Sequence, residues 1–207
     1  MKVLMINGSP HKNGCTYTAL CEVAKELSDA GIETEIMHVG SEPLRGCMAC
    51  GICRETKSGR CIHDDIVNAA LAKAEHADGF VFGSPVHYAA PSGQITSFLH
   101  RFFYAGRGFE LKPGAAVVSC RRGGSTAAFE QLNKYFTVSG MPVVSSQYWN
   151  MVHGNTPDEV RQDYEGMQIM RTLGKNMAWL LKSIEVGAKA GIAKPEKEQR
   201  VATNFIR

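Results

Sequence analysis

The sequence predicts an α/β fold built around a parallel, doubly wound sheet of five strands. Five short apolar runs alternate with amphipathic segments along the 207 residues. Parallel strands need crossover connections, usually helices, so this alternation favours a parallel sheet with helices on both faces. The first and third runs share an ending, because Gly-Ser-Pro occurs at 8–10 and again at 83–85. A chain of this length that is 44% hydrophobic and 21% charged fits one core.

The strands are read from short apolar segments bounded by turn residues. They are expected at 2–7, 32–39, 80–85, 115–120 and 142–149. The second segment alternates apolar with polar residues, which is typical of a strand at the edge of a sheet.

The helices are read from apolar residues that recur every three to four positions. They are expected at 15–30, 64–77, 92–104, 125–139 and 157–186. Thr16 or a neighbour can cap the first helix, and Asp64 or Asp65 can cap the second. The last helix contains Gly166 and Gly174, and either offers a place for a kink.

The charge pattern gives no support to nucleic-acid or membrane binding. The net charge is +3, from 23 basic and 20 acidic residues, and no run of five like charges occurs. The first ten residues hold too short an apolar run for a signal segment, and no stretch reaches the 18 or so apolar residues of a membrane span. We therefore expect a cytoplasmic protein, in which the seven cysteines are thiols, metal ligands or redox groups.

The loop after the first strand, GSPHKNGCT at 8–16, is the first candidate binding segment. It leads into a helix N-terminus, where free backbone N–H groups and the helix dipole favour a phosphate. The sequence matches neither a Walker A motif nor the GxGxxG dinucleotide turn. An ordinary strand-to-helix connection is the competing interpretation.

The loops after the third and fourth strands are the other candidates, since ligands of open α/β sheets lie at the carboxyl ends of the strands. The segment SPVHYAAPSGQ at 84–94 is stiffened by two prolines and presents His87 and Tyr88, which suit the edge and face of a flat ring. The segment SCRRGGSTAAF at 119–129 contains a Gly-Gly pair that allows close approach of the backbone.

These three loops, in this order and on these elements, resemble those of the flavodoxin-like NADPH-dependent FMN reductase family, including its iron-sulfur flavoprotein branch. The resemblance covers nearly the whole chain. It implies the strand order 2-1-3-4-5, FMN as cofactor, NAD(P)H as reductant, and a homodimer or homotetramer. Relatives in this family commonly have Arg or Lys at the position of His11 and Asn at the position of Cys15. At the position of His87 they often have Tyr.

The resemblance also implies which residues bind FMN. The residues matched to the phosphate loop are Ser9, His11, Cys15 and Thr16. Those matched to the loop that holds the isoalloxazine ring are Pro85, Val86, His87 and Tyr88. The third loop contributes Ser119, Arg121, Gly123 and Gly124.

On this resemblance we expect an FMN-dependent oxidoreductase that takes a hydride from NAD(P)H and reduces a quinone, a nitro or azo compound, or a flavin. Hydride transfer needs no general base, so no catalytic side chain is assigned. One alternative is an iron-sulfur flavoprotein that exchanges electrons with ferredoxin. Another is a flavin-binding regulatory protein or scaffold.

Four cysteines, Cys47, Cys50, Cys53 and Cys61, are spaced C-x2-C-x2-C-x7-C in the connection between the second strand and the next helix. Three of them at successive three-residue spacing resemble the compact iron-sulfur run, whereas zinc prefers two separated C-x2-C pairs. The alternatives are a 4Fe-4S cluster, free or redox-active thiols, and zinc. If a cluster forms, these four cysteines are its expected ligands.

Three further features carry weaker expectations. Arg101 is expected to anchor its helix or an interface, and His153 is a candidate substrate contact after the fifth strand. Residues 1–188 form the expected FMN-binding domain, followed by a C-terminal extension at 189–207. Because the extension ends in Phe-Ile, we expect residues 203–207 to pack on the flavin side of the domain or on a neighbouring subunit.

Overall fold

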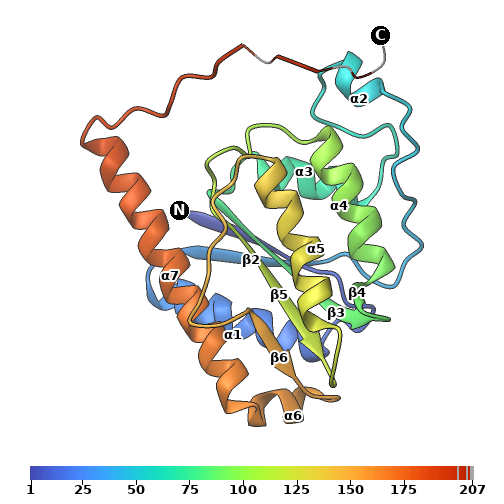
Figure 1. Cartoon of the computed structure of the whole chain (residues 1–207), viewed down its shortest axis with the longest axis vertical. Coiled ribbons are helices and arrows are strands. Elements are labelled where there is room, and N and C mark those ends of the chain that lie inside the picture. Colours follow the sequence, from blue (N-terminus) through green and yellow to red (C-terminus); the bar gives the residue numbers. More distant parts are fainter. Residues whose placement is uncertain (200, 204, 206–207) are drawn as a thin grey trace.

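A parallel sheet runs through the centre of the computed structural model, which describes residues 1–199, 201–203 and 205 (Figure 1). Its strand order is β2-β1-β3-β5-β6, which confirms the predicted order of the five main strands. The bounds are β1 Lys2–Asn7, β2 Glu33–His38, β3 Gly79–His87, β5 Gly114–Cys120 and β6 Met151–His153. A two-residue strand, β4 Ala90–Pro91, pairs antiparallel with the end of β3.

Helices cover both faces of the sheet. Their bounds are α1 Cys15–Asp29, α2 Ile52–Glu55, α3 Ile66–Ala74, α4 Gly93–Ala105, α5 Ser125–Val138, α6 Pro157–Gln162 and α7 Tyr164–Lys189. Alternate residues of each strand serve opposite faces, so Leu4 and Ile6 pack toward α3, α4 and α5, whereas Val3 and Met5 pack toward α1 and α7. The sheet is therefore buried on both sides, which explains the continuous apolar runs of its strands.

Aromatic packing fixes α4 against the sheet. Phe80 and Phe82 of β3 meet Phe102 of α4 edge to face, with ring centroids 6.0 and 5.9 Å apart. Phe82 also stacks on Phe136 of α5 at 5.1 Å. Because these rings are fully buried, α4 is a rigid support for the segments at its two ends.

The predicted fifth strand is wrong over most of its length. Only Val143 forms a bridge, to Gly114, and the strand itself begins at Met151. Ser146 causes the difference, because its hydroxyl donates to the backbone oxygen of Tyr148 at 2.7 Å and holds the intervening residues in a turn. The apolar residues of this segment therefore belong to a turn that returns to the sheet, rather than to a strand.

The predicted last helix is divided in two. Asp163 separates α6 from α7, because its Oδ1 accepts from the backbone N–H of Gly166 at 2.9 Å and caps α7. Its Oδ2 accepts from the backbone N–H of His153 at 2.6 Å. The break therefore lies three residues before Gly166, at a capping carboxylate and not at a glycine kink.

Beyond α7 the chain runs away from the helices and the sheet (Figure 1), and Lys197 Nζ still donates to Glu110 Oε1 of the body at 2.9 Å. Phe205 is 92% exposed in the single chain. Asn204, Ile206 and Arg207 lie outside the described residues, so packing of 203–207 on the flavin side of the domain or on a neighbouring subunit stays a prediction. Across the described part of the chain, no helix combines the length and apolar character needed to cross a membrane.

Candidate functional site

The loop after β1 is ordered by its own polar groups. Asn7 is fully buried, and its side chain accepts from the backbone N–H of Ser9 at 3.1 Å and donates to the backbone oxygen of Lys12 at 3.0 Å. The hydroxyl of Ser9 accepts in turn from the backbone N–H of His11 at 3.1 Å. These bonds curl the loop in front of α1, with His11 and Lys12 exposed.

The helices α1 and α5 begin without a side-chain cap. Their N-cap residues are Gly14 and Gly124. By contrast, α3, α4, α6 and α7 are each capped by a side chain, from Asp65, Ser92, Thr156 and Asp163. The first N–H groups of a helix lack partners within it, so α1 and α5 present free donors and the positive end of a dipole to a ligand. These two helices follow the first and third loops singled out in the sequence.

A buried hydrogen bond ties these two loops together. Thr16 Oγ1 lies 2.8 Å from Ser119 Oγ, between the first turn of α1 and the end of β5. Thr16 therefore does not cap α1 but fixes it to the neighbouring strand. Next to it, burial raises the pKa of the Cys15 thiol, which donates weakly to the backbone oxygen of Gly154 at 3.7 Å. A neutral thiol at this position does not repel an anion.

The segment after β3 is a tight hairpin. His87 pairs with Ala90, and the two residues between them, Tyr88 and Ala89, have φ of 48° and 62°. Two successive left-handed residues are typical of a type I′ turn, which is unusual for residues other than Gly and Asn. Pro85 and Val86 are half-buried, whereas His87 and Tyr88 are exposed at the tip.

The hairpin is in contact with the loop after β5. Gly124 has φ +88°, and a Cβ built on it would lie 2.8 Å from Ala89 Cα. Gly124 is therefore required both for its conformation and for the close approach of the two backbones. Gly123 and Arg121 are exposed beside it.

The structure thus brings all twelve predicted FMN-binding residues to the carboxyl edge of the sheet, and their binding of FMN stays a prediction. Three residues were missed by the sequence argument. Asn7 organises the first loop, Lys12 supplies an exposed permanent cation beside His11, and Ser92 links the first two loops. The Ser92 hydroxyl donates to the backbone oxygen of Gly8 at 2.6 Å and caps α4. The available signals were a polar residue at the end of an apolar strand, Asn7, and a lysine within the candidate phosphate loop, Lys12.

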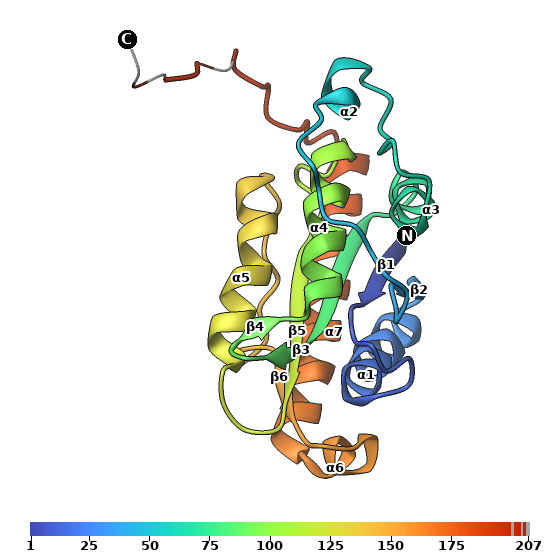
Figure 2. The same cartoon turned by 90° about the vertical axis from the view of Figure 1, so that its right-hand side faces the viewer.

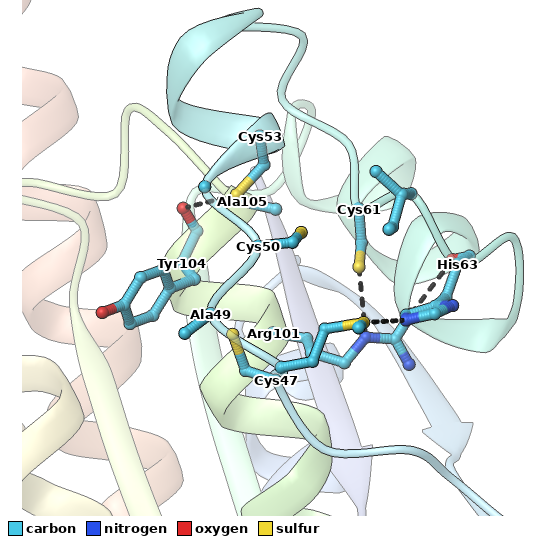
Figure 3. A pocket seen from close by; sticks show the side chains of 12 residues that line it. Cys47, Ala49, Cys50, Cys53, Cys61, His63, Arg101, Tyr104 and Ala105 are labelled. Atoms are coloured by element: carbon cyan, nitrogen blue, oxygen red, sulfur yellow. Dashed lines mark hydrogen bonds between the residues drawn. The ribbon is translucent and has the colours of Figure 1, made fainter.

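A second candidate site is the pocket lined by Cys47, Cys50, Cys53 and Cys61 (Figure 3). Ala49 and Gly51 have φ of 54° and 78°, so the backbone reverses on each side of Cys50. All seven cysteines are free thiols, with Cys47 and Cys50 exposed and Cys53 and Cys61 half-buried. Cys15, Cys21 and Cys120 lie on other elements.

The pocket is closed on one side by α4. Arg101, Tyr104 and Ala105 line it together with Met48 and His63. Within the described residues, no three His, Cys, Asp or Glu side chains are grouped closely enough to hold a single metal ion. An iron-sulfur cluster differs from an ion because four thiolates bind it around its periphery. The donor set, four cysteines around one mostly apolar pocket, fits such a cluster.

The two candidate sites lie at opposite ends of α4 (Figure 2). Ser92 caps the helix beside the β3–β4 hairpin, and Arg101 lies nine residues further on, about 14 Å along the axis at 1.5 Å per residue. The helix thus runs directly from the hairpin to the cysteine pocket.

The chain is similar to known proteins in both sequence and fold. Residues 1–156 match the model of the family described as NADPH-dependent FMN reductase. An iron-sulfur flavoprotein of Methanocaldococcus jannaschii is 32% identical over 194 residues, which cover 89% of this chain and all of that protein. An iron-sulfur flavoprotein of Archaeoglobus fulgidus is 29% identical over 163 residues, covering 77% of this chain and 73% of that protein. A flavodoxin from the domain Archaea has the same fold, with a TM-score of 0.60 at 14% identity over 88% of this chain and 99% of that one.

Proposed function

Since the chain belongs to the NADPH-dependent FMN reductase family, we propose that it is an FMN-dependent oxidoreductase that takes a hydride from NAD(P)H. Its acceptor is a small electron-poor molecule, such as a quinone, a nitro or azo compound, or a flavin. FMN, when bound, supplies the hydride and electron chemistry.

The observation that carries this proposal is the pair of uncapped helices. Among the helices longer than four residues, α1 and α5 are the two whose N-terminal donors have no side-chain cap in the described chain. Both N-termini lie at the carboxyl edge of the sheet, which is where ligands of open α/β sheets bind. Free donors at this edge suit a phosphorylated ligand.

The residues of the chain have separate tasks in this proposal. The N-terminus of α1, with Ser9, Thr16 and Lys12, holds the phosphate of FMN. The backbone of the β3–β4 hairpin and of Gly123 and Gly124 holds the edge of the ring. The hairpin leaves His87 and Tyr88 exposed, so these side chains are available to reductant or acceptor at the ring face.

The experiment is steady-state oxidation of NADPH and NADH by the FMN-loaded chain with a panel of quinone, nitro, azo and flavin acceptors. Turnover of about 1 to 1,000 per second with at least one acceptor is expected of an enzyme. Turnover below about 0.01 per second with every acceptor contradicts the proposal. The chain would then be a flavin-binding regulatory protein or an electron carrier.

A second candidate is favoured by the cysteine pocket. The chain would then be an iron-sulfur flavoprotein that passes electrons between FMN and an external carrier such as ferredoxin through a 4Fe-4S cluster. The support is the convergence of Cys47, Cys50, Cys53 and Cys61 on one pocket and the similarity to two archaeal proteins that are named iron-sulfur flavoproteins. Free or redox-active thiols are the alternative.

The cluster test is anaerobic reconstitution with iron and sulfide. About four iron atoms per chain, lost on substitution of Cys50→Ser and unaffected by Cys21→Ser, support the cluster. Less than about one iron per chain would contradict the cluster and favour free or redox-active thiols. The cysteine at 21 is a matched control because it lies on α1, outside the pocket.

We also propose a homodimer or homotetramer, which light scattering of the FMN-loaded chain tests.

A further inference from the structure

The guanidinium of Arg101 is buried at the wall of the cysteine pocket. The side chain is 1% exposed, although it carries a permanent charge. Five hydrogen bonds use its three nitrogen atoms. Nη1 donates to Asp65 Oδ2 at 2.6 Å and to the backbone oxygen of Arg45 at 3.2 Å. Nη2 donates to Asp65 Oδ1 and to the backbone oxygen of His63, both at 3.0 Å.

The fifth donor points to sulfur. Nε lies 3.3 Å from Cys61 Sγ (Figure 3). Asp65 and the two carbonyls occupy both terminal nitrogens, so the guanidinium cannot rotate without losing four other bonds. The geometry therefore holds one N–H of a permanent cation on the sulfur of one cysteine in the pocket.

The backbone of Cys61 is fixed as firmly as its sulfur. Asn68 is buried, and its Oδ1 accepts from the Cys61 backbone N–H at 2.8 Å. Its Nδ2 donates to the Cys61 backbone oxygen at 2.9 Å. Cys47 and Cys50 lie on the exposed part of the loop and have no comparable support among the described contacts. Cys61 is thus held both at its backbone and at its sulfur, whereas Cys53 is held by helix α2 and a weak contact from its Sγ to the backbone oxygen of Tyr104 at 3.7 Å.

We propose that Arg101 is a positioning residue that raises the reduction potential of a 4Fe-4S cluster through the hydrogen bond from Nε to Cys61 Sγ. The inference rests on the cluster of the second candidate function. One-electron reduction adds negative charge that is shared with the ligand sulfurs, while no bond forms or breaks. A charged N–H donor stabilises the reduced form more than the oxidised form, which raises the potential.

The neighbouring carboxylate acts in the opposite direction. Asp65 pairs with both terminal nitrogens of Arg101 and offsets part of its charge at the sulfur. Removal of this negative charge, with Arg101 kept, leaves the guanidinium uncompensated. The two residues should therefore shift the potential with opposite signs, which a purely structural role of the pair does not produce.

The experiment is a dithionite titration of the reconstituted full chain, followed by electron paramagnetic resonance, on wild type and three variants. Arg101→Met removes donor and charge at similar length, and Asp65→Asn keeps Arg101 and a residue able to cap α3. Arg54→Met is the matched control, because Arg54 is an exposed cation of the same loop, 4.2 Å above the Tyr104 ring. Iron per chain and FMN content are measured on the same samples.

We expect Arg101→Met to make reduction about tenfold less favourable, a shift of about 59 mV for a one-electron couple. Asp65→Asn should shift the potential upward. Arg54→Met should change the equilibrium constant for reduction less than about threefold. If Arg101→Met does not fold or load iron, Asp65→Asn decides alone, and an unchanged or lower potential overturns the inference. Failure of the wild type to take up iron also overturns it, whereas FMN binding and NADPH oxidation by that sample would leave the oxidoreductase proposal standing.

Discussion

Thr16 Oγ1 and Ser119 Oγ share a buried hydrogen bond of 2.8 Å that joins the first turn of α1 to the end of β5. This contact holds the N-terminus of α1 against β5, the strand whose following loop leads into α5, at the carboxyl edge of the sheet. The geometry of the candidate FMN site therefore depends on a pair of hydroxyls 103 residues apart in the sequence.

Substitution of Thr16→Val removes one partner of this bond and keeps the side-chain shape. We expect a loss of about 1 to 3 kcal/mol in the free energy of unfolding, because the Ser119 hydroxyl stays buried without its partner. Urea unfolding of the FMN-free chain measures it. The double variant Thr16→Val with Ser119→Ala should recover part of this loss. If the double variant instead loses as much stability as the two single variants together, the result would contradict the pairing.

Substitution of Gly124→Ala should disturb the contact between the hairpin and the loop after β5. An alanine in the left-handed region costs about 1 to 2 kcal/mol, and its Cβ would lie 2.8 Å from Ala89 Cα. We expect lower stability together with weaker FMN binding, measured by urea unfolding and flavin fluorescence. Gly31→Ala is the control, since Gly31 has φ +78° but a Cβ there meets nothing within 4 Å, and equal effects of the two changes on FMN binding would refute this role for Gly124.

Substitution of Lys12→Gln should weaken FMN binding at low ionic strength by up to about fivefold, the range of an exposed charge pair. The physical reason is the loss of an exposed cation in the phosphate loop. Because salt screens exposed charges, the difference should shrink as salt is raised. Lys25→Gln removes the same charge from the exposed surface of α1 and should leave the dissociation constant unchanged.

Substitution of Asp65→Ala should destabilise the cysteine loop. It removes the cap of α3 and leaves the buried Arg101 without its counter-charge. We expect the free energy of unfolding to fall by about 3 kcal/mol. This is the lower end of the range for a broken buried ion pair, because Asp65 is itself partly exposed. Asp64→Ala breaks an exposed pair with Arg60 and should cost less than about 1 kcal/mol. Similar losses for the two aspartates, compared by chemical denaturation, would count against the Arg101 anchor.

The parallel sheet followed from the sequence because strands buried on both faces leave continuous apolar runs, whereas its strand order was implied by the resemblance of the three loops to a known family. The fifth strand did not follow from the sequence, since residues 142–149 are as apolar as a strand but are held in a turn by Ser146. That turn depends on a hydroxyl contact two residues along the chain, which apolar spacing cannot show. The division of the last helix at Asp163 had a local signal, a capping residue three positions before Gly166, that the search for glycine kinks overlooked.

The candidate FMN loops could be located from the sequence, because their glycines, prolines and hydroxyls follow strand ends. The role of Arg101 could not be resolved beyond an anchor. Its partners Arg45, Cys61 and Asp65 are 36 to 56 residues away along the chain. Only the packing of α4 against the cysteine loop brings them to one guanidinium.

The most direct measurement is an anaerobic absorption titration of the chain, first with FMN and then with NADPH. The account predicts that one FMN binds per chain, that NADPH or NADH bleaches the flavin band, and that a quinone acceptor restores it. A chain that binds no flavin at saturating FMN, or whose bound flavin neither nucleotide reduces, would contradict the central claim.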